Sequence, residues 1–424
     1  MKILVIGNGF DLEHGLPTKY KDFLDFMQGI YLINLITSIS DKGAFIAELE
    51  RTTKHKVDEN IKKYFTQEKF LDPDLIKEWK EEKISKELID GANNNIWIKY
   101  FIENMNYEKE GWIDLESEIS NVIKCLEYSK NLSNYLKKFN EWPADRDREV
   151  YKEKVVEKII KFSELKIQFF ELVGKNLENI INTIIKHLNN LIVCLEIYLV
   201  ECVGNMDVKD VAPDIKENHC DKVLSFNYSD THHRLYDIYP TNPKEYDYIH
   251  GKANITREES ENNMVLGIDE YLDSESKNKE LEFIAFKKYF QRIYKKTGNE
   301  YKKWIKQIED SYKEKLEKEV DFAKTVAKTD EEIFEEALVS MNKNHKNQIY
   351  IFGHSLDITD KDIIKELIEC PDTETTIFYY DKDVYAQQIA NMVKIIGQDE
   401  LIKRVSGANP TIIFKQQQQR INRD

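Results

Sequence analysis

The sequence predicts an α/β fold with an open, mostly parallel sheet and large α-helical insertions. The first observation is a set of short apolar runs that end in Gly, Asn, Asp or His. Such endings are typical of strands in an α/β sheet whose ligand lies beyond their carboxyl ends. The second is the scarcity of helix breakers, since the 424 residues include only 15 Gly and 8 Pro. The third is helical periodicity in the long, charged stretches between the strands.

The first predicted strand covers residues 3–6 and leads directly into Gly7-Asn8-Gly9. Consecutive apolar residues indicate a parallel strand buried on both faces. Glycines admit positive φ and carry no Cβ, so the N–H groups of this loop could turn toward an anion. We therefore expect a phosphate-bearing nucleotide here, as in a Rossmann-like fold. The alternative is a tight turn without a ligand, because Gly15 comes too late for the fingerprint G-x-G-x-x-G.

The composition argues against several classes of protein. A net charge of −15 disfavours a protein whose main task is to coat nucleic acid. The five cysteines are widely separated and lack C-x-x-C spacing, so neither a disulfide framework nor a thiolate zinc site is indicated, and a reducing cytoplasm fits. The apolar N-terminal run is too short for a signal peptide, and no apolar stretch approaches about 18 residues. We expect a cytoplasmic protein without membrane contact.

Helical insertions divide the predicted domains. We expect residues 1–30, 218–270 and 345–415 to form the nucleotide-binding core, 31–217 a first helical insertion, 271–344 a second, and 416–424 a disordered tail. The first insertion contains a long helix with a coiled-coil-like seam of apolar residues spaced four and three apart, namely Leu177, Ile181, Ile184, Leu188, Leu191, Leu195 and Tyr198. A seam of this length would otherwise be a large apolar patch, so we expect a homo-oligomer through this helical insertion. The alternative is a hairpin with neighbouring helices that covers the seam.

Another helix of the first insertion contains a candidate site residue. Its apolar residues share one face, namely Trp112, Leu115, Ile119, Val122, Ile123 and Leu126. Glu116 falls at the edge of this stripe, so its carboxylate is predicted to point inward. An inward acid needs a partner or a shifted pKa, which makes Glu116 a candidate for the site. The alternative is a simple ion pair with a lysine.

The second half of the chain returns to strands. They are predicted at 222–226, 246–249, 264–267, 348–353, 375–380 and 411–414. The second insertion carries a run of basic residues at 287–296, which we call the basic stripe. It is either a solvated helix face or a contact for a phosphate or nucleic acid.

Four strand-end segments carry the unusual residues of the chain: Gly7-Asn8-Gly9 through Gly15-Leu16-Pro17, Phe226-Asn227-Tyr228, His250-Gly251, and Gly353-His354-Ser355-Leu356. Their order resembles the sirtuin fold, where a G-A-G loop reaches G-I-P or G-L-P and later strands end in an Asn motif, in His-Gly and in G-x-S-L. Five motifs are similar to those of the AbiH family of bacterial abortive-infection proteins. They are I-G-N-G-F-D-L-E-H-G-L-P-T-K-Y, S-F-N-Y, I-H-G, W-I-D-L-E and F-G-H-S-L.

The resemblance implies an anti-phage effector that hydrolyses NAD, its substrate, in a sirtuin-like pocket. Breaking the bond between nicotinamide and ribose develops oxocarbenium character. Asn227 would hold the ribose or orient the attacking water, and His250 would act as the base. Neither a metal nor a covalent nucleophile is required. The other residues expected at the nucleotide are Gly7, Asn8, Gly9, Phe10, Asp11, His14, Pro17, Glu116, Tyr228, Asp230, Gly251, Gly353, His354 and Ser355.

The sequence also departs from the sirtuin pattern. Asp230 follows Asn227 by three residues where sirtuins have two, and Asp11 replaces a Ser or Thr. Asp11 could bind a ribose hydroxyl but would repel a phosphate. The four-Cys zinc module of the deacetylases is absent, which removes the main reason to expect a protein deacylase.

Two alternatives to NAD hydrolysis remain open. The first is a metal-dependent nuclease or RNA-processing toxin, in which Glu116, Asp11 and Asp230 hold Mg²⁺ and the basic stripe grips phosphates. Nucleic acid would then be the partner, which the acidic composition does not favour. The second is a non-catalytic sensor that binds a nucleotide stoichiometrically and signals to a partner.

Overall fold

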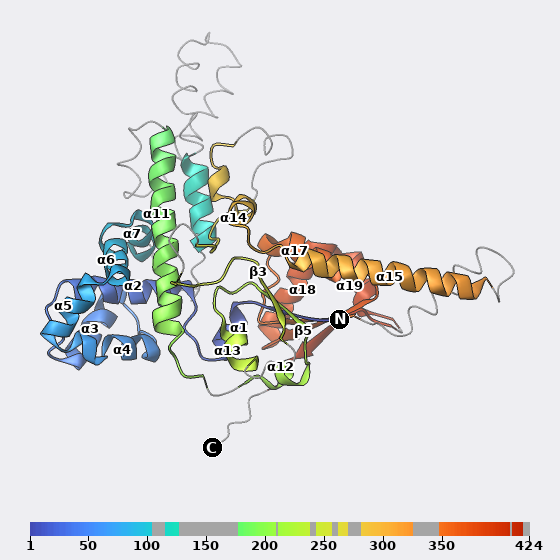
Figure 1. Ribbon diagram of the computed structural model, residues 1–424, viewed down its shortest axis with the longest axis horizontal. Coiled ribbons are helices and arrows are strands. Elements are labelled where there is room, and N and C mark those ends of the chain that lie inside the picture. Colours follow the sequence, from blue (N-terminus) through green and yellow to red (C-terminus); the bar gives the residue numbers. More distant parts are fainter. Residues whose placement is uncertain are drawn as a thin grey trace, which may run out of the picture. The chain divides into compact units, whose positions relative to one another are not determined.

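A computed structural model of the protein describes residues 1–103, 115–126, 177–208, 211–237, 243–256, 262–269, 281–324, 347–407 and 409–418. The chain forms two compact units (Figure 1). Unit 1 consists of Met1–Thr18, Gly204–Ala253 and Lys296–Asp424. Unit 2 consists of Lys19–Val203 and Asn254–Lys295.

Unit 1 is built on six parallel strands, namely β1 (Lys2–Ile6), β2 (Lys222–Ser225), β3 (Glu245–Tyr248), β4 (Asn347–Phe352), β5 (Thr373–Tyr379) and β6 (Ile412–Gln416). Their order across the sheet is β3-β2-β1-β4-β5-β6, and every neighbouring pair is parallel. This is the doubly wound, Rossmann-like order, which confirms the predicted fold class. The order reverses between β1 and β4, so the carboxyl ends of these strands are where such a sheet binds ligands.

Both faces of the sheet are covered, which explains the continuous apolar runs of its strands. Ile3 and Val5 of β1 pack on one face, whereas Leu4 and Ile6 pack on the other. The first face is covered by α15 (Tyr301–Ala323), α17 (Lys361–Ile368), α18 (Lys382–Ile396) and α19 (Gln398–Val405). The second is covered by α1 (Asn8–Glu13), α12 (Pro213–Glu217) and α13 (Thr231–Tyr236).

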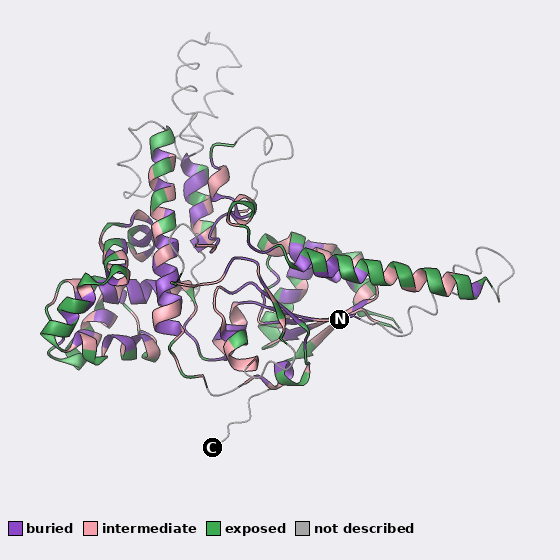
Figure 2. Ribbon diagram, in the orientation of Figure 1, coloured by how far each residue is buried: buried purple, intermediate pink, exposed green. Residues whose placement is uncertain are grey.

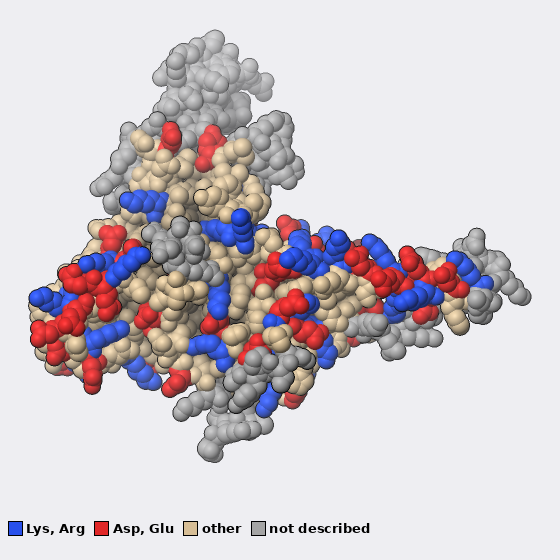
Figure 3. Space-filling model, viewed as in Figure 1, with Lys and Arg blue, Asp and Glu red and all other residues tan. Residues whose placement is uncertain are grey.

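Helix α15 packs on the sheet through the apolar residues of its first half. Tyr301, Trp304, Ile305 and Ile308 are buried there. Beyond them the helix is mostly exposed (Figure 2). Acidic and basic side chains alternate along its visible face (Figure 3), so α15 presents no continuous basic surface on that side. This helix lies within the predicted second insertion, yet it belongs to the unit that contains the sheet.

Unit 2 is helical in its described part, as predicted for the first insertion. Its elements are α2 (Tyr20–Asn34), α3 (Lys42–Thr53), α4 (Glu59–Phe65), η1 (Glu68–Phe70), α5 (Pro73–Glu81), α6 (Lys83–Asn94), α7 (Ile96–Glu103), a helix over 115–126, α11 (Leu177–Ile197), η3 (Tyr198–Val203), η6 (Ile284–Phe286) and α14 (Lys288–Lys295). Aspartate side chains accept hydrogen bonds at the amino ends of α3, α4 and α5. In the core of unit 2 the ring centroids of Phe26 and Tyr198 lie 4.9 Å apart.

The apolar seam of the long helix is covered by its own unit. Ile184, Leu188, Leu191, Leu195 and Tyr198 are buried, and α11 packs against α6 and α7. The indole of Trp97 on α7 donates a hydrogen bond to the carbonyl oxygen of Ile184 at 2.9 Å. From Ile184 to Tyr198 the seam is therefore not the exposed apolar patch that would favour a homo-oligomer.

One helix of the described chain, Glu178–Val203, is long and apolar enough to cross a membrane by length and composition. Of its most apolar stretch, 56% is buried inside the structure, and core helices of soluble proteins meet the same criterion.

Two predictions about the strands and the tail are wrong. Residues 264–267 lie in unit 2 and form no strand, because the side-chain amide of Gln291 takes the place of a neighbouring strand. It accepts from the Leu266 N–H at 3.1 Å and donates to the Leu266 carbonyl at 3.0 Å. Residues 416–418 are ordered, since β6 extends to Gln416 and the N–H of Gln418 donates to Asp214 at 2.7 Å. The rest of the predicted tail, 419–424, lies outside the described residues.

Candidate functional site

The carboxyl ends of β1, β2, β3 and β4 bring most of the predicted site residues to one edge of the sheet in unit 1. Asp11, Asn227, His250 and His354 follow these four strands, and the exposed fraction of each is at most 6%. Buried polar side chains at the ligand-binding edge of a doubly wound sheet define the candidate site.

The glycines after β1 contact the loop after β4 through their backbone. The N–H groups of Gly7 and Gly9 donate to the carbonyl oxygens of Phe352 and Gly353, at 3.2 and 2.8 Å. A Cβ on Gly9 would lie 2.8 Å from the Gly353 Cα. The backbone that approaches these glycines is thus the loop after β4. Gly15 has a φ of 72° and faces open space, and Pro17 is buried.

Phe10 and His14 are core residues of unit 1. Phe10 is fully buried and packs against the ring of Phe352. The imidazole of His14 contacts the Phe10 carbonyl through Nδ1 at 2.7 Å and the Tyr236 hydroxyl through Nε2 at 2.8 Å. Because a carbonyl only accepts, Nδ1 must carry the proton and Nε2 must accept from Tyr236. A histidine satisfied in this way has a structural role.

Asp11 is a buried carboxyl group on α1, the short helix that follows β1. The hydroxyl of Ser229 donates to its Oδ2 at 2.6 Å, and Thr231 in turn donates to Ser229 at 3.0 Å. Its Oδ1 has no hydrogen-bond donor among the described residues. Burial raises the pKa of Asp11 to about 6, and Ser229 lowers it less than burial raises it. Such a group fits acid–base or charge-stabilising chemistry.

Asn227 ties the loop after β2 to the loop after β1. Its side-chain amide donates to the Gly7 carbonyl at 3.0 Å, and its own N–H donates to the Ser225 hydroxyl at 3.1 Å. The Asn8 side chain accepts from the Thr18 hydroxyl at 2.7 Å. The amide of Asn227 therefore has a structural contact in addition to any contact with a ligand.

Asp230 is held by two cations of its own unit. Its carboxylate lies 3.3 Å from Arg234 Nε and 3.4 Å from Lys252 Nζ. The preceding Tyr228 accepts a hydrogen bond at its carbonyl from the Ala253 N–H at 2.9 Å. These contacts join the loops after β2 and β3.

His250 and His354 flank the carboxylate of Asp360, which was not among the predicted site residues. His250 Nε2 lies 3.6 Å from Asp360 Oδ1, and His354 Nε2 lies 3.4 Å from Asp360 Oδ2. Gly251, with a φ of 79°, makes the turn after His250. The Ser355 carbonyl accepts from Asn391 of α18 at 3.0 Å. The only sequence signal for Asp360 is its position before the helix that follows G-H-S-L.

Glu116 lies in unit 2 and forms an ion pair there. Its Oε2 is 2.6 Å from Lys288 Nζ, and its side chain is 19% exposed. The apolar face beside it is buried as predicted, from Leu115 to Leu126; Trp112 lies outside the described residues. The alternative interpretation, an ion pair with a lysine, is confirmed. Among the described residues, no group of three or more His, Cys, Asp or Glu side chains has a geometry that could hold a metal ion.

The basic stripe is not a solvated face throughout. Lys287 and Lys288 are buried, and Lys295 donates to the Met264 carbonyl. Burial lowers the pKa of Lys295 to about 8. The residues of α14 most open to solvent are Ile293 and Tyr294, which are 70% and 77% exposed. Lys287, Lys288 and Lys295 therefore do not form an open basic surface for a phosphate, whereas Lys296 is exposed.

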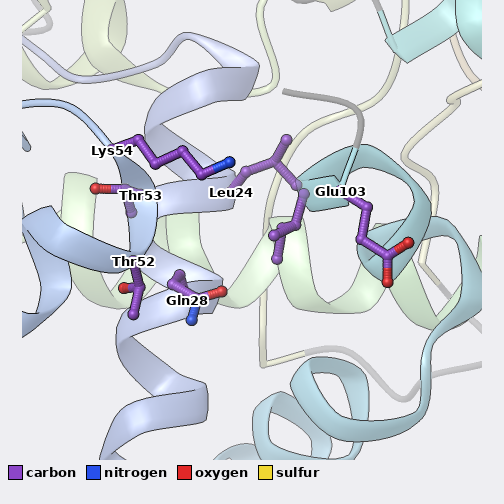
Figure 4. A pocket seen from close by; sticks show the side chains of 7 residues that line it. Leu24, Gln28, Thr52, Thr53, Lys54 and Glu103 are labelled. Atoms are coloured by element: carbon purple, nitrogen blue, oxygen red, sulfur yellow. The ribbon is translucent and has the colours of Figure 1, made fainter. Parts of the chain in front are cut away.

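A pocket in unit 2 lies among helices and contains none of the predicted site residues (Figure 4). It is lined by Leu24, Gln28, Thr52, Thr53, Lys54, Ile102 and Glu103. We therefore assign the candidate site to the strand ends of unit 1.

The raised pKa of Asp11 predicts a pH-dependent stability. The pKa of about 6 in the folded state exceeds the ordinary value of 3.8, so the folded protein binds the extra proton between about pH 4 and 6. This stabilisation is complete below about pH 4, and it is lost as the pH rises through about 6. The corresponding change in the free energy of unfolding is about 3 kcal/mol. In the wild-type protein the free energy of unfolding should fall between pH 4.5 and 7. In Asp11→Asn it should fall less, and urea titration measures both.

Asp22 of unit 2 provides the matched control for this measurement. Burial raises its pKa to about 6 as well, yet it lies outside the candidate site. Asp22→Asn should reduce the same pH dependence without affecting the site. An Asp11→Asn protein with the full wild-type pH dependence would show that Asp11 is charged in the folded state at pH 5.

Comparison with known proteins gives one match. A family model described as "Bacteriophage abortive infection AbiH" matches residues 3–381. This range includes all four strand-end segments. No curated protein and no solved structure matches the chain, so the comparisons do not confirm the resemblance to sirtuins.

Proposed function

The chain belongs to the AbiH family of bacteriophage abortive infection, and from this premise we propose that it acts by hydrolysing NAD at the bond between nicotinamide and ribose. The observation that carries the proposal is the set of buried polar side chains at the carboxyl edge of the sheet. A carboxyl group, an amide and an imidazole follow three different strands, at the edge where doubly wound sheets bind nucleotides.

These groups fit the demands of the reaction. The nicotinamide ring of NAD carries a positive charge, and it leaves as a neutral molecule when the electrons of the bond to the ribose carbon pass to the ring nitrogen. The ribose then bears the charge as an oxocarbenium ion. A negative charge at the same edge of the sheet, such as that of Asp11, stabilises this ion more than the uncleaved substrate.

Water completes the reaction. Its oxygen bonds to the ribose carbon, and its proton passes to His250 and then to solvent. The products are nicotinamide and ADP-ribose. Asn227 would position the ribose or the water from the loop after β2. None of these steps calls for a metal or a covalent nucleophile.

The contacts of the acidic residues do not favour the nuclease. That alternative needs Asp11, Asp230 and Glu116 to share Mg²⁺. Asp230 is already paired with Arg234 and Lys252, and Glu116 with Lys288. The buried lysines of the basic stripe likewise offer no grip for a polynucleotide.

Incubation of the purified protein with NAD, with and without EDTA, tests the proposal. We expect nicotinamide to be released at equal rates in both samples. Chromatography measures the released nicotinamide. Cleavage of RNA only in the presence of Mg²⁺, with NAD intact, would support the nuclease instead. Binding of NAD in a one-to-one ratio without turnover would identify a sensor.

A further inference from the structure

The carboxylate of Asp360 lies between two imidazoles at the candidate site. It belongs to the short helix η7 (Ile358–Asp360), and its side chain is 13% exposed. His250 and His354 approach its two oxygens from the loops after β3 and β4, through Nε2 in both cases. The distances of 3.6 and 3.4 Å are those of ion pairs and are longer than hydrogen bonds. Contacts of catalytic groups often shorten only when the substrate is bound.

The loop after β4 fixes the orientation of His354. Gly353 and Leu356 both adopt left-handed backbone conformations, with φ of 65° and 57°. The N–H of Leu356 donates to His354 Nδ1 at 2.9 Å. Because Nδ1 accepts, the proton of the neutral ring must lie on Nε2, where it points to Asp360. The same proton prevents Nε2 of the neutral ring from binding a metal.

The rest of this loop is held from α18. Gln388 donates to the His354 carbonyl at 3.2 Å, and Asn391 donates to that of Ser355 at 3.0 Å. Left-handed backbone at a leucine costs free energy and is kept only where the surroundings hold it in place. The loop therefore fixes the position of His354.

The ring of Phe226 packs against both imidazoles. Its centroid lies 5.7 Å from that of His250 and 4.3 Å from that of His354, with both pairs edge-on. An aromatic ring in this position limits the rotation of both histidines. Each histidine is thus kept with Nε2 toward the shared carboxylate.

We propose that Asp360 is a positioning residue for His250, an inference that rests on the proposed function. With Nε2–H of His250 directed to Asp360, the neutral ring presents Nδ1 as its basic nitrogen. When Nδ1 takes the proton of the attacking water, the carboxylate stabilises the imidazolium that forms. Asp360 therefore sets both the tautomer and the proton affinity of the base, while His354 holds Asp360 in place.

The test follows the two histidines directly, without relying on turnover. The Cε1–H signals of His250 and His354 are titrated by NMR in the wild-type protein and in Asp360→Asn. Removal of a neighbouring negative charge should lower the pKa of His250 by about one unit or more. His354→Ala should raise it, because Asp360 then has one donor fewer. A His250 titration that Asp360→Asn leaves unchanged would overturn the proposal.

Asp357 supplies the matched control. It lies in the same segment, caps η7 through a hydrogen bond from Thr359 N–H at 3.0 Å, and is exposed. Asp357→Asn should leave the titration of His250 at its wild-type value, and an equal change in both variants would mean that η7 acts only as a scaffold. Asp360→Glu, which keeps the negative charge, should return the pKa of His250 most of the way to its wild-type value.

Turnover then connects the residue to the reaction. In a protein that hydrolyses NAD, Asp360→Asn should lower kcat at least about 10-fold with little change in KM, and the acidic limb of the pH profile should move to lower pH with His250. Should no NAD be hydrolysed at all, the proposed function fails, and the NMR titration still decides whether Asp360 holds the two histidines.

Discussion

Replacing His250 by Ala should lower the turnover of NAD by about 10²-fold to 10⁴-fold, the usual effect of losing a positioned base. Nucleotide affinity should change far less, because the loss falls on the chemical step. The side chain of His250 is almost fully buried beside Phe226 and Asp360, so His250→Gln, which better preserves the packing, should be made alongside. Nicotinamide release at saturating NAD measures the effect, and thermal unfolding confirms that each variant is folded.

Asn227→Ala should reduce turnover to a similar degree, with an additional effect on stability. Its amide donates to the buried Gly7 carbonyl at 3.0 Å, and a buried carbonyl left without its donor costs about 1–3 kcal/mol. Because both residues would serve one transition state, the double variant should be scarcely worse than the poorer single variant. Expression of any of the three in a host should change from toxic to tolerated.

The exposed His233 of α13 provides the control for this series. His233→Ala should retain wild-type turnover and toxicity. Full toxicity of both His250→Ala and Asn227→Ala would contradict NAD hydrolysis at the strand ends, and the nuclease would then become the better hypothesis.

The strand ends could be predicted from the sequence because their residue types are rare and follow apolar runs. Residues 3–6 and 348–353 were identified by consecutive apolar residues, and these form the adjacent strands β1 and β4. The candidate histidines follow from the same pattern. Asp360 could not be found in this way, since an aspartate at the start of a helix is common. Its contacts with His250 and His354 exist only after three separate segments have folded together.

The predictions for Gly9 and the basic stripe show what a pattern leaves undetermined. A glycine indicates that something approaches the backbone closely, but it does not indicate whether that is a ligand or another loop. Here it is Gly353. Similarly, a run of lysines on a short helix indicates solvent exposure by default. On α14 the polar face is the buried one, because Lys288 meets Glu116 and Gln291 pairs with an extended segment that needs hydrogen bonds.

Gly353→Ala should destabilise unit 1 by more than about 4 kcal/mol, which places it among the most severe single substitutions. Two costs add. The φ of 65° at this residue is left-handed, which costs an alanine roughly 1–2 kcal/mol. In addition, its Cβ would lie 2.1 Å from the Phe10 nitrogen and 2.5 Å from the Gly9 carbonyl carbon. Both are backbone atoms that other bonds hold in place, so no side-chain rotation can relieve the clash.

Gly15→Ala separates the two costs. Gly15 has a similar φ of 72°, but no atom lies within 4 Å of the position of its Cβ. The alanine should therefore cost only the backbone term of roughly 1–2 kcal/mol. The free energies of unfolding of both variants, measured by urea titration, give the comparison. If Gly353→Ala were no more destabilising than Gly15→Ala, the loops after β1 and β4 would have room between them, and Gly7 to Gly9 would again be open to the approach of a nucleotide phosphate.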